Sequence, residues 1–152
     1  MRQKPAPDMP AHPDVDEMLC FSIYSAGHSF NQLYRPLLDA IGLTYPQYLV
    51  MVALWNRDGR TVKELGETLF LDSSTLTPLL KRLEAAGLLT RTRNPQDERQ
   101  VLLHVSEQGR ALQQEAAPVA QCVNDTVGLD ADTVKKIRTA IDAIRDSLHK
   151  RA

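Results

Sequence analysis

Residues 72–105 carry the pattern that most restricts how this chain can fold. Asp72 is suited to cap a helix whose apolar residues recur every three or four positions until Gly87 ends it. Residues 88–93 and 100–105 follow as two short apolar strands, and the NPQDER segment between them has the composition of a turn with a charged tip. The pattern therefore predicts an amphipathic helix that leads directly into a β-hairpin.

Two further helices are predicted before this one. One starts at Thr44, and a shorter one starts at Thr61, where Glu64 completes a capping box. Trp55 and Phe70 fall at helical spacing in these two segments and are predicted core residues. Helix, turn, helix and hairpin in this order predict a winged helix-turn-helix, a mainly α fold with a small β-hairpin.

Long amphipathic helices are predicted on both sides of this core. Residues 14–42 predict one helix and residues 107–150 predict two, of which the last carries a narrow apolar stripe on a polar background. Such a stripe needs a partner surface, so we expect these helices to form a homodimer. The predicted division is a disordered tail at 1–13 and a single domain at 14–152, with dimerisation helices at about 14–42 and 107–150 and a DNA-binding core at about 44–106.

Charge alone does not indicate a nucleic-acid partner, because the 152 residues carry a formal net charge of −1. The middle segment, residues 56–110, has a small positive balance of nine basic against eight acidic residues. Any affinity for DNA must then come from a few arginines at contact points, doubled in a dimer, and not from a broad basic field.

The polar face of the predicted 72–86 helix admits two interpretations. Hydroxyl groups at a helix N-terminus followed by a basic pair suit entry into the major groove, but they also suit a face that is merely solvated. The hairpin decides between them, because arginines on a charged wing can reach a narrow minor groove. We therefore predict binding to double-stranded DNA at a palindromic operator. The candidate contacts are Ser73, Ser74, Thr75, Thr77, Lys81 and Arg82 on the helix, and Arg91, Arg93, Asp97 and Arg99 on the hairpin.

Cys20 and Cys122 are the two cysteines, 102 positions apart and outside any metal-binding or Cys-x-x-Cys spacing. A lone cysteine in an apolar helix is most often a small core residue, whereas a thiol flanked by phenols can be ionised and oxidised. Tyr34 lies fourteen positions after Cys20. At 1.5 Å per residue this is about 21 Å along a helix, so the two side chains can meet only across paired first helices of a dimer.

Two stretches resemble a known family. The run LFLDSSTLTPLLKRLEAAGLLTRTRNPQDERQVLLHVSEQGRAL, with its Asp97-x-Arg99 wing, resembles the MarR family of winged-helix regulators. Together with the early LCFSIYSA segment, it is similar to the organic-hydroperoxide-resistance repressor (OhrR) subfamily. The resemblance implies a repressor in which Cys20 reacts with organic hydroperoxides, while Tyr34 and Tyr45 hydrogen-bond its thiolate.

The resemblance also implies the two-cysteine type of this subfamily. Cys122 would resolve the oxidised thiol as an intersubunit disulfide, and the repressor would release its operator. Residues Ser73, Thr75, Arg82 and Arg99 match DNA contacts of the family. The chain departs from its relatives at Ser74, where glycine is frequent.

Other functional classes are not indicated. The four histidines, His12, His28, His104 and His149, have no ligand spacing, so we predict no metal site, and the absence of a nucleotide-binding glycine loop predicts no cofactor. No apolar run has membrane length, and the loop usual in thiol peroxidases is missing, so we predict a cytoplasmic regulator and not an enzyme. One alternative stays open: a MarR-type regulator that responds to a bound lipophilic or phenolic ligand, with Cys20 structural.

Overall fold

The computed structural model describes residues 12–151, so most of the predicted tail lies outside the described residues. The elements of this range, in chain order, are η1 (Val15–Glu17), α1 (Leu19–Asp39), α2 (Tyr45–Asn56), β1 (Arg60–Thr61), α3 (Val62–Leu69), α4 (Ser73–Ala85), β2 (Leu89–Asn94), β3 (Asp97–Val105), α5 (Glu107–Val127) and α6 (Ala131–His149). The predicted mainly α winged helix-turn-helix is confirmed.

Side-chain caps explain where most of these helices begin. The residue before each of α2 to α6 accepts a hydrogen bond from the backbone N–H three positions later, which satisfies one of the unpaired donors of the first turn. The capping residues are Thr44, Thr61, Asp72, Ser106 and Asp130. The starts predicted at Thr44, Thr61 and Asp72 are therefore confirmed.

The three strands form one antiparallel sheet in the order β1-β3-β2. The β2–β3 hairpin is longer than predicted, because its pairing runs from Leu89↔Val105 out to Asn94↔Asp97 and leaves only two residues in the turn. Asn94 makes this possible: its side chain accepts from the backbone N–H of Gln96 and donates across the hairpin to Gln100. The two-residue strand β1 was not predicted, since so short a segment shows no alternation of apolar and polar residues.

The core lies between α2, α3, α4 and the sheet. Leucines from each of these elements are at most 1% exposed, and α5 and the second half of α1 extend the same apolar cluster. The leucines that centre it are Leu54, Leu65, Leu76, Leu80, Leu83, Leu89 and Leu103. This packing fixes α4 and the hairpin relative to one another.

Phe70 is a correction to the predicted core. Its backbone takes the left-handed conformation, with φ 55°, where it ends α3, and 49% of the residue is exposed. The turn directs the ring outward, where it lies under the Arg145 guanidinium (4.0 Å) and against the His149 ring (5.2 Å between centroids). Trp55 is half-buried as part of the core, and its indole N–H donates to the Gly109 carbonyl.

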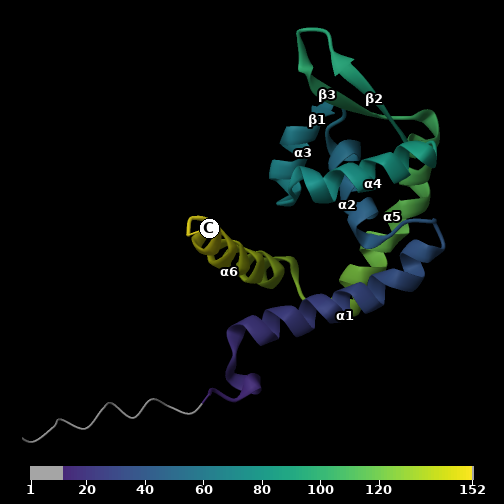
Figure 1. Cartoon of the computed structure of the whole chain (residues 1–152). Helices are drawn as coiled ribbons and strands as arrows, with labels where there is room; N and C mark the ends of the chain where they lie inside the picture. Colours follow the sequence, from purple (N-terminus) through teal and green to yellow (C-terminus); the bar gives the residue numbers. More distant parts are fainter. Residues whose placement is uncertain (1–11, 152) are drawn as a thin grey trace, which may run out of the picture.

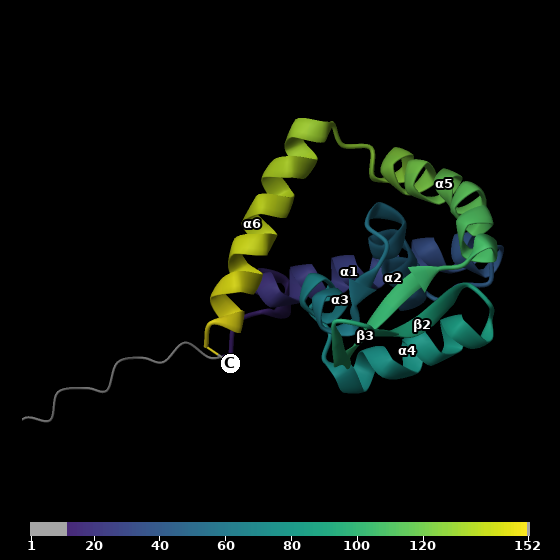
Figure 2. The same ribbon diagram turned by 90° about the horizontal axis from the view of Figure 1, so that it is seen from above.

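The helices predicted to dimerise lie away from the wing. Figure 1 shows α5 running from the sheet to α1, with the hairpin at the opposite end of the molecule. In Figure 2 α6 lies to one side of α2 and α4, and its Arg145 and His149 contact Phe70 at the end of α3. Helix α6 has no buried residue, and its apolar stripe includes exposed Ile137, Ile141 and Leu148. Across residues 12–151, none of the helices is both long and apolar enough to cross a bilayer.

Candidate DNA interface and thiol sensor

The first turn of α4 presents hydroxyl groups held by one carboxylate. Asp72 Oδ1 accepts from the Thr75 backbone N–H (2.8 Å) and from the Ser74 hydroxyl (2.6 Å). These hydrogen bonds, that from Ser74 first, lower the pKa of the Asp72 carboxyl. Ser73 and Thr75 are exposed beside this cap, and the Ser74 hydroxyl already donates to Asp72.

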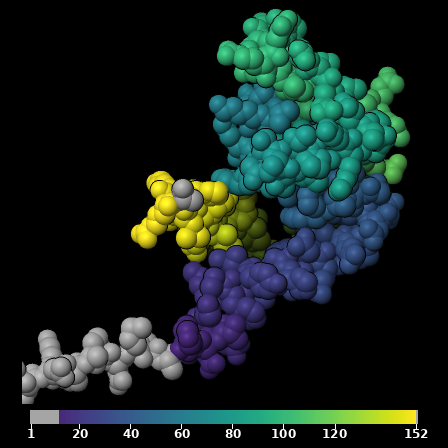
Figure 3. Space-filling model, viewed as in Figure 1, coloured from purple at the N-terminus to yellow at the C-terminus, as the bar shows by residue number. Residues whose placement is uncertain are grey.

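The rest of the predicted helix face is also at the surface. Lys81 and Arg82 are exposed on the later turns, and Thr77 is half-buried. Figure 3 shows the surface of α4 passing without a break into that of the wing. Helix α4 and the wing, which are predicted to contact DNA, therefore share one face of the molecule.

The wing ends in an arginine that is ordered by its neighbour. Asp97 Oδ1 accepts from both the backbone N–H and the Nε–H of Arg99, each at 3.2 Å, and 92% of the Arg99 side chain is exposed. Arg93 on β2 is exposed as well. A cation held outward on a hairpin has the geometry needed to enter a minor groove.

Arg91 is placed differently from the other wing arginines. Its Nε and Nη2 donate to the two carboxylate oxygens of Glu84 on α4, each at 3.1 Å. About a third of each side chain is exposed, 31% for Arg91 and 39% for Glu84. The structure thus gives this predicted DNA residue an intramolecular partner.

A groove of about 860 Å³ lies between α3, α4 and the wing, and His149 at the end of α6 also lines it. Its apolar floor includes Leu76 and Leu80, while Thr77, Arg91 and Arg99 contribute polar groups. Because α4 forms one side of it and the wing another, this groove belongs to the candidate DNA interface.

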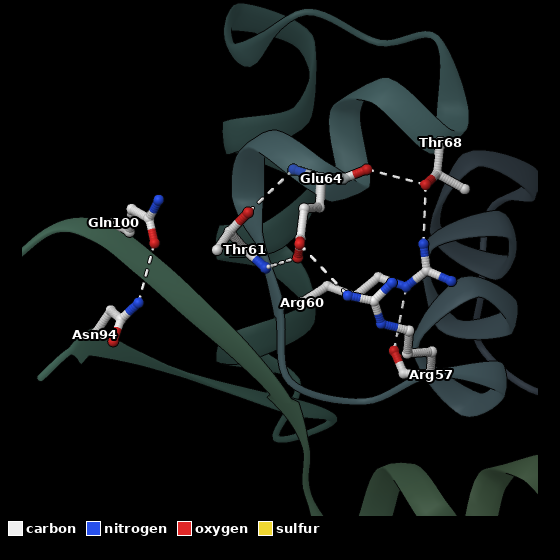
Figure 4. A network of polar contacts seen from close by, with 7 residues as sticks. All are labelled: Arg57, Arg60, Thr61, Glu64, Thr68, Asn94 and Gln100. Carbon is white, nitrogen blue, oxygen red and sulfur yellow. Dashed lines mark hydrogen bonds and ion pairs between the residues drawn. The ribbon is translucent and has the colours of Figure 1, made fainter. Parts of the chain in front are cut away.

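Polar contacts fix α3, the helix on which α4 packs (Figure 4). Glu64 accepts from the backbone N–H of Thr61, which is the main cause of its lowered pKa, and pairs with Arg57 at 3.4 Å. Arg60 donates to the Thr68 hydroxyl at 2.8 Å and to the Arg57 carbonyl. These five residues tie both ends of α3 to the loop that precedes it.

Both cysteines are free thiols at the surface of the single chain. Cys20 is the second residue of α1, and Cys122 lies on α5. The Cys20 thiol is therefore not buried within one chain, and its expected contact with Tyr34 is one between subunits. Tyr34 lies fourteen residues further along the same continuous helix, which is the separation that places the two groups about 21 Å apart.

The predicted phenols do come together, and a third joins them. The Tyr34 ring lies 4.7 Å from that of Tyr45 and 5.8 Å from that of Tyr48. Burial, and then the neighbouring Tyr45, raise the pKa of Tyr34 to about 12, and burial raises the pKa of Tyr45 and Tyr48. No site role was predicted for Tyr48, although it lies one helical turn after Tyr45 and so on the same face of α2.

Comparisons with known proteins agree with this geometry. Residues 32–116 match the family described as transcriptional regulator SarA/Rot. The chain is 46% identical to the HTH-type transcriptional regulator TtmR of Methylorubrum extorquens, over 91% of this chain and 71% of that one. It is 38% identical to the organic hydroperoxide resistance transcriptional regulator of Bacillus subtilis, over 92% and 95% of the two chains. The chain belongs to the SarA/MarR-type family of winged-helix transcriptional regulators.

A solved structure supports the assignment of this regulator. AbfR of Staphylococcus epidermidis superposes with a TM-score of 0.72 at 35% identity, over 87% of the regulator and 91% of AbfR. AbfR has been crystallised on DNA in reduced and in overoxidised form, and also with a disulfide formed. The Methylorubrum and Bacillus relatives are transcriptional regulators, and AbfR binds DNA.

Proposed function

We propose that this regulator is a cytoplasmic repressor that senses organic hydroperoxides through Cys20 and then releases its operator. The observation that carries the proposal is the coexistence, on one α1 helix, of an exposed thiol and a phenol that belongs to a half-buried tyrosine cluster. The similarity to the Bacillus organic hydroperoxide regulator supports the same chemistry.

The proposed DNA contacts are divided between the two grooves. The hydroxyls of the first turn of α4, with Lys81 and Arg82, would enter the major groove, and Arg99, ordered by Asp97, would enter the adjacent minor groove with Arg93 beside it. The helix residues in this role are Ser73, Ser74, Thr75, Thr77, Lys81 and Arg82. Arg91 lies on the same face, but Glu84 occupies one edge of its guanidinium.

A homodimer is part of the proposal. The apolar stripe of α6 and the first half of α1 leave large side chains exposed, including Leu19, Phe21, Ile137 and Ile141. Burying such surface against a second copy would bring two DNA-binding cores together, as a palindromic operator requires. The dimerisation helices would then be 14–42 and 107–150, around a DNA-binding core at 44–106.

In such a dimer the thiol of one subunit would lie at the phenols of the other. Phenolic donors would stabilise the Cys20 thiolate, which attacks the O–O bond of the hydroperoxide. The S–O bond forms, the O–O bond breaks, and the alkoxide takes a proton, giving a sulfenic acid and an alcohol. The Cys122 thiol of the other subunit would then attack the sulfenic sulfur, forming the S–S bond and releasing water. Because a disulfide requires Cα atoms within about 7 Å, its formation would move the helices and with them the wings.

The test measures binding to the duplex upstream of the regulator's own gene, before and after one equivalent of cumene hydroperoxide. The wild type should bind and then release, and Cys20→Ser should bind and stay bound. Non-reducing electrophoresis of Cys122→Ser should show no intersubunit disulfide. If Cys20→Ser releases DNA as the wild type does, the thiol is not the sensor, and a regulator responding to a bound lipophilic or phenolic ligand is the better description.

A further inference from the structure

Arg91 and Glu84 form the most regular ion pair across the candidate DNA interface. Two parallel N–H···O contacts of 3.1 Å join one edge of the guanidinium to both oxygens of the carboxylate. This fork geometry fixes orientation as well as distance, which a single contact does not. Both side chains are about two-thirds covered, so the pair is better shielded from solvent than the Arg99–Asp97 pair at the wing tip.

The pair spans the joint between the recognition helix and the wing. Glu84 lies in the last turn of α4, and Arg91 is the third residue of β2. The backbone between them turns through Gly87, at φ 76°, and is anchored where the Leu88 N–H donates to the Leu83 carbonyl. In addition to this backbone hydrogen bond, the ion pair joins the two sides of the turn through side chains.

The pair also neutralises the negative charge of Glu84, which is unfavourable at its position. Glu84 is a carboxylate near the C-terminus of a helix, where the helix dipole disfavours negative charge, and it lies on a helix proposed to face phosphates. The Arg91 hydrogen bonds lower the pKa of Glu84, so the carboxylate stays ionised and paired. An unpaired Glu84 would repel DNA.

We propose that Arg91 is a positioning residue and not a DNA contact: with Glu84 it forms a strut that sets the angle of the wing relative to α4. The proposal rests on the proposed DNA-binding function and divides the three wing arginines between two roles. Arg93 and Arg99 reach DNA, while Arg91 holds the hairpin that presents them.

For Glu84→Ala, the strut predicts a change in DNA affinity opposite in sign to the change expected from charge alone. Removing a negative charge beside DNA should tighten binding, and Glu67→Ala is the matched control, since Glu67 lines the same groove and makes no ion pair within residues 12–151. Glu84→Ala should instead weaken binding. We expect about a threefold loss at each wing and about tenfold for a dimer with two wings, as for a partly covered bidentate pair.

Arginine variants give a second, independent comparison. Arg91→Ala should weaken binding as much as Glu84→Ala does, the double variant should be no worse than either, and the dependence of log K on log salt should keep its slope. Arg93→Ala, on the same face of β2, should lower that slope by about one per wing, as loss of a phosphate contact does. Arg91→Lys should recover only part of the loss, because an ammonium cannot make the fork.

Hydrogen exchange of the free protein tests the strut without DNA. Glu84→Ala and Arg91→Ala should both speed amide exchange in the hairpin, residues 89–105, and Glu67→Ala and Arg93→Ala should not. Tighter binding by Glu84→Ala, a reduced salt slope for Arg91→Ala, or unchanged exchange in both would overturn the proposal. A wild type that fails to bind DNA would instead refute the proposed function, and the exchange result would still decide the strut.

Discussion

Gly109→Ala tests whether α5 is fixed against the base of the wing as the structure describes. Gly109 is the third residue of α5, and a Cβ atom there would lie 2.2 Å from the Leu88 carbonyl oxygen and 2.8 Å from a methyl of Val105. The first distance is about 1 Å inside the closest C···O approach of ~3.3 Å. The Leu88 carbonyl cannot turn aside freely, because it accepts the Ser106 N–H at 3.1 Å.

The expected cost combines three effects. Overpacking costs about 1–3 kcal/mol, and a clash with backbone belongs at the upper end of that range. Displacing the Gly109 carbonyl from the Trp55 indole N–H, now 2.9 Å away, costs about 1 kcal/mol more. The higher helix propensity of alanine returns roughly 0.5–1 kcal/mol. The net loss is about 2–3 kcal/mol, or roughly 5–10 °C in Tm for a chain of this size.

Urea unfolding followed by circular dichroism measures this loss, at one fixed chain concentration because dimerisation would add to stability. Gln108→Ala is the matched control: it changes the adjacent, exposed position of the same turn and should stay within about 0.5 kcal/mol of the wild type. If Gly109→Ala is as stable as this control, the close approach of α5 to Leu88 is not present in solution.

Two further predictions concern the sensor and the wing. The pKa of Tyr34 is raised from 10.0 to about 12, and those of Tyr45 and Tyr48 are also raised, so the unfolded chain loses phenolic protons first; stability should hold below pH 10 and fall as pH rises toward 12. Ultraviolet titration should show phenolate appearing at higher pH in the folded than in the urea-unfolded chain, and coincident curves would contradict the buried cluster. Arg99→Ala should weaken operator binding and reduce its salt slope by about one per wing, whereas an unchanged slope would mean that the wing tip does not reach phosphates.

Local signals in the sequence were sufficient for the fold. Helix caps at Thr44, Thr61 and Asp72 act within three residues, and the apolar periods of α2 to α4 and of the hairpin continue from them, so each element could be located without knowledge of its neighbours. Phe70 shows where this reasoning fails. Its spacing is that of a core residue, but a left-handed backbone at the end of α3 directs the ring out of the core.

The candidate site was harder to predict from the sequence, because its decisive features are contacts between residues on different elements. Residue type alone placed Arg91 with the DNA contacts, and only the folded chain brings it to Glu84, seven positions away on another element. Tyr48 was missed for the same reason, since its approach to Tyr34 joins two helices. The separation of Cys20 from Tyr34, in contrast, followed from the length of α1 and could be predicted.

In the proposed dimer each sensor combines the thiol of one subunit with the phenols of the other. Mixed dimers of Cys20→Ser and Tyr34→Phe chains, prepared by co-expression with two different tags, test this arrangement. In such a dimer one site pairs an intact Cys20 with an intact Tyr34, while the other site has neither. We predict that half of the sites react with cumene hydroperoxide at the wild-type rate, although neither parent homodimer does. If the mixed dimer reacts no faster than the Tyr34→Phe homodimer, the thiol and the phenol do not meet across the subunits, and the account is wrong.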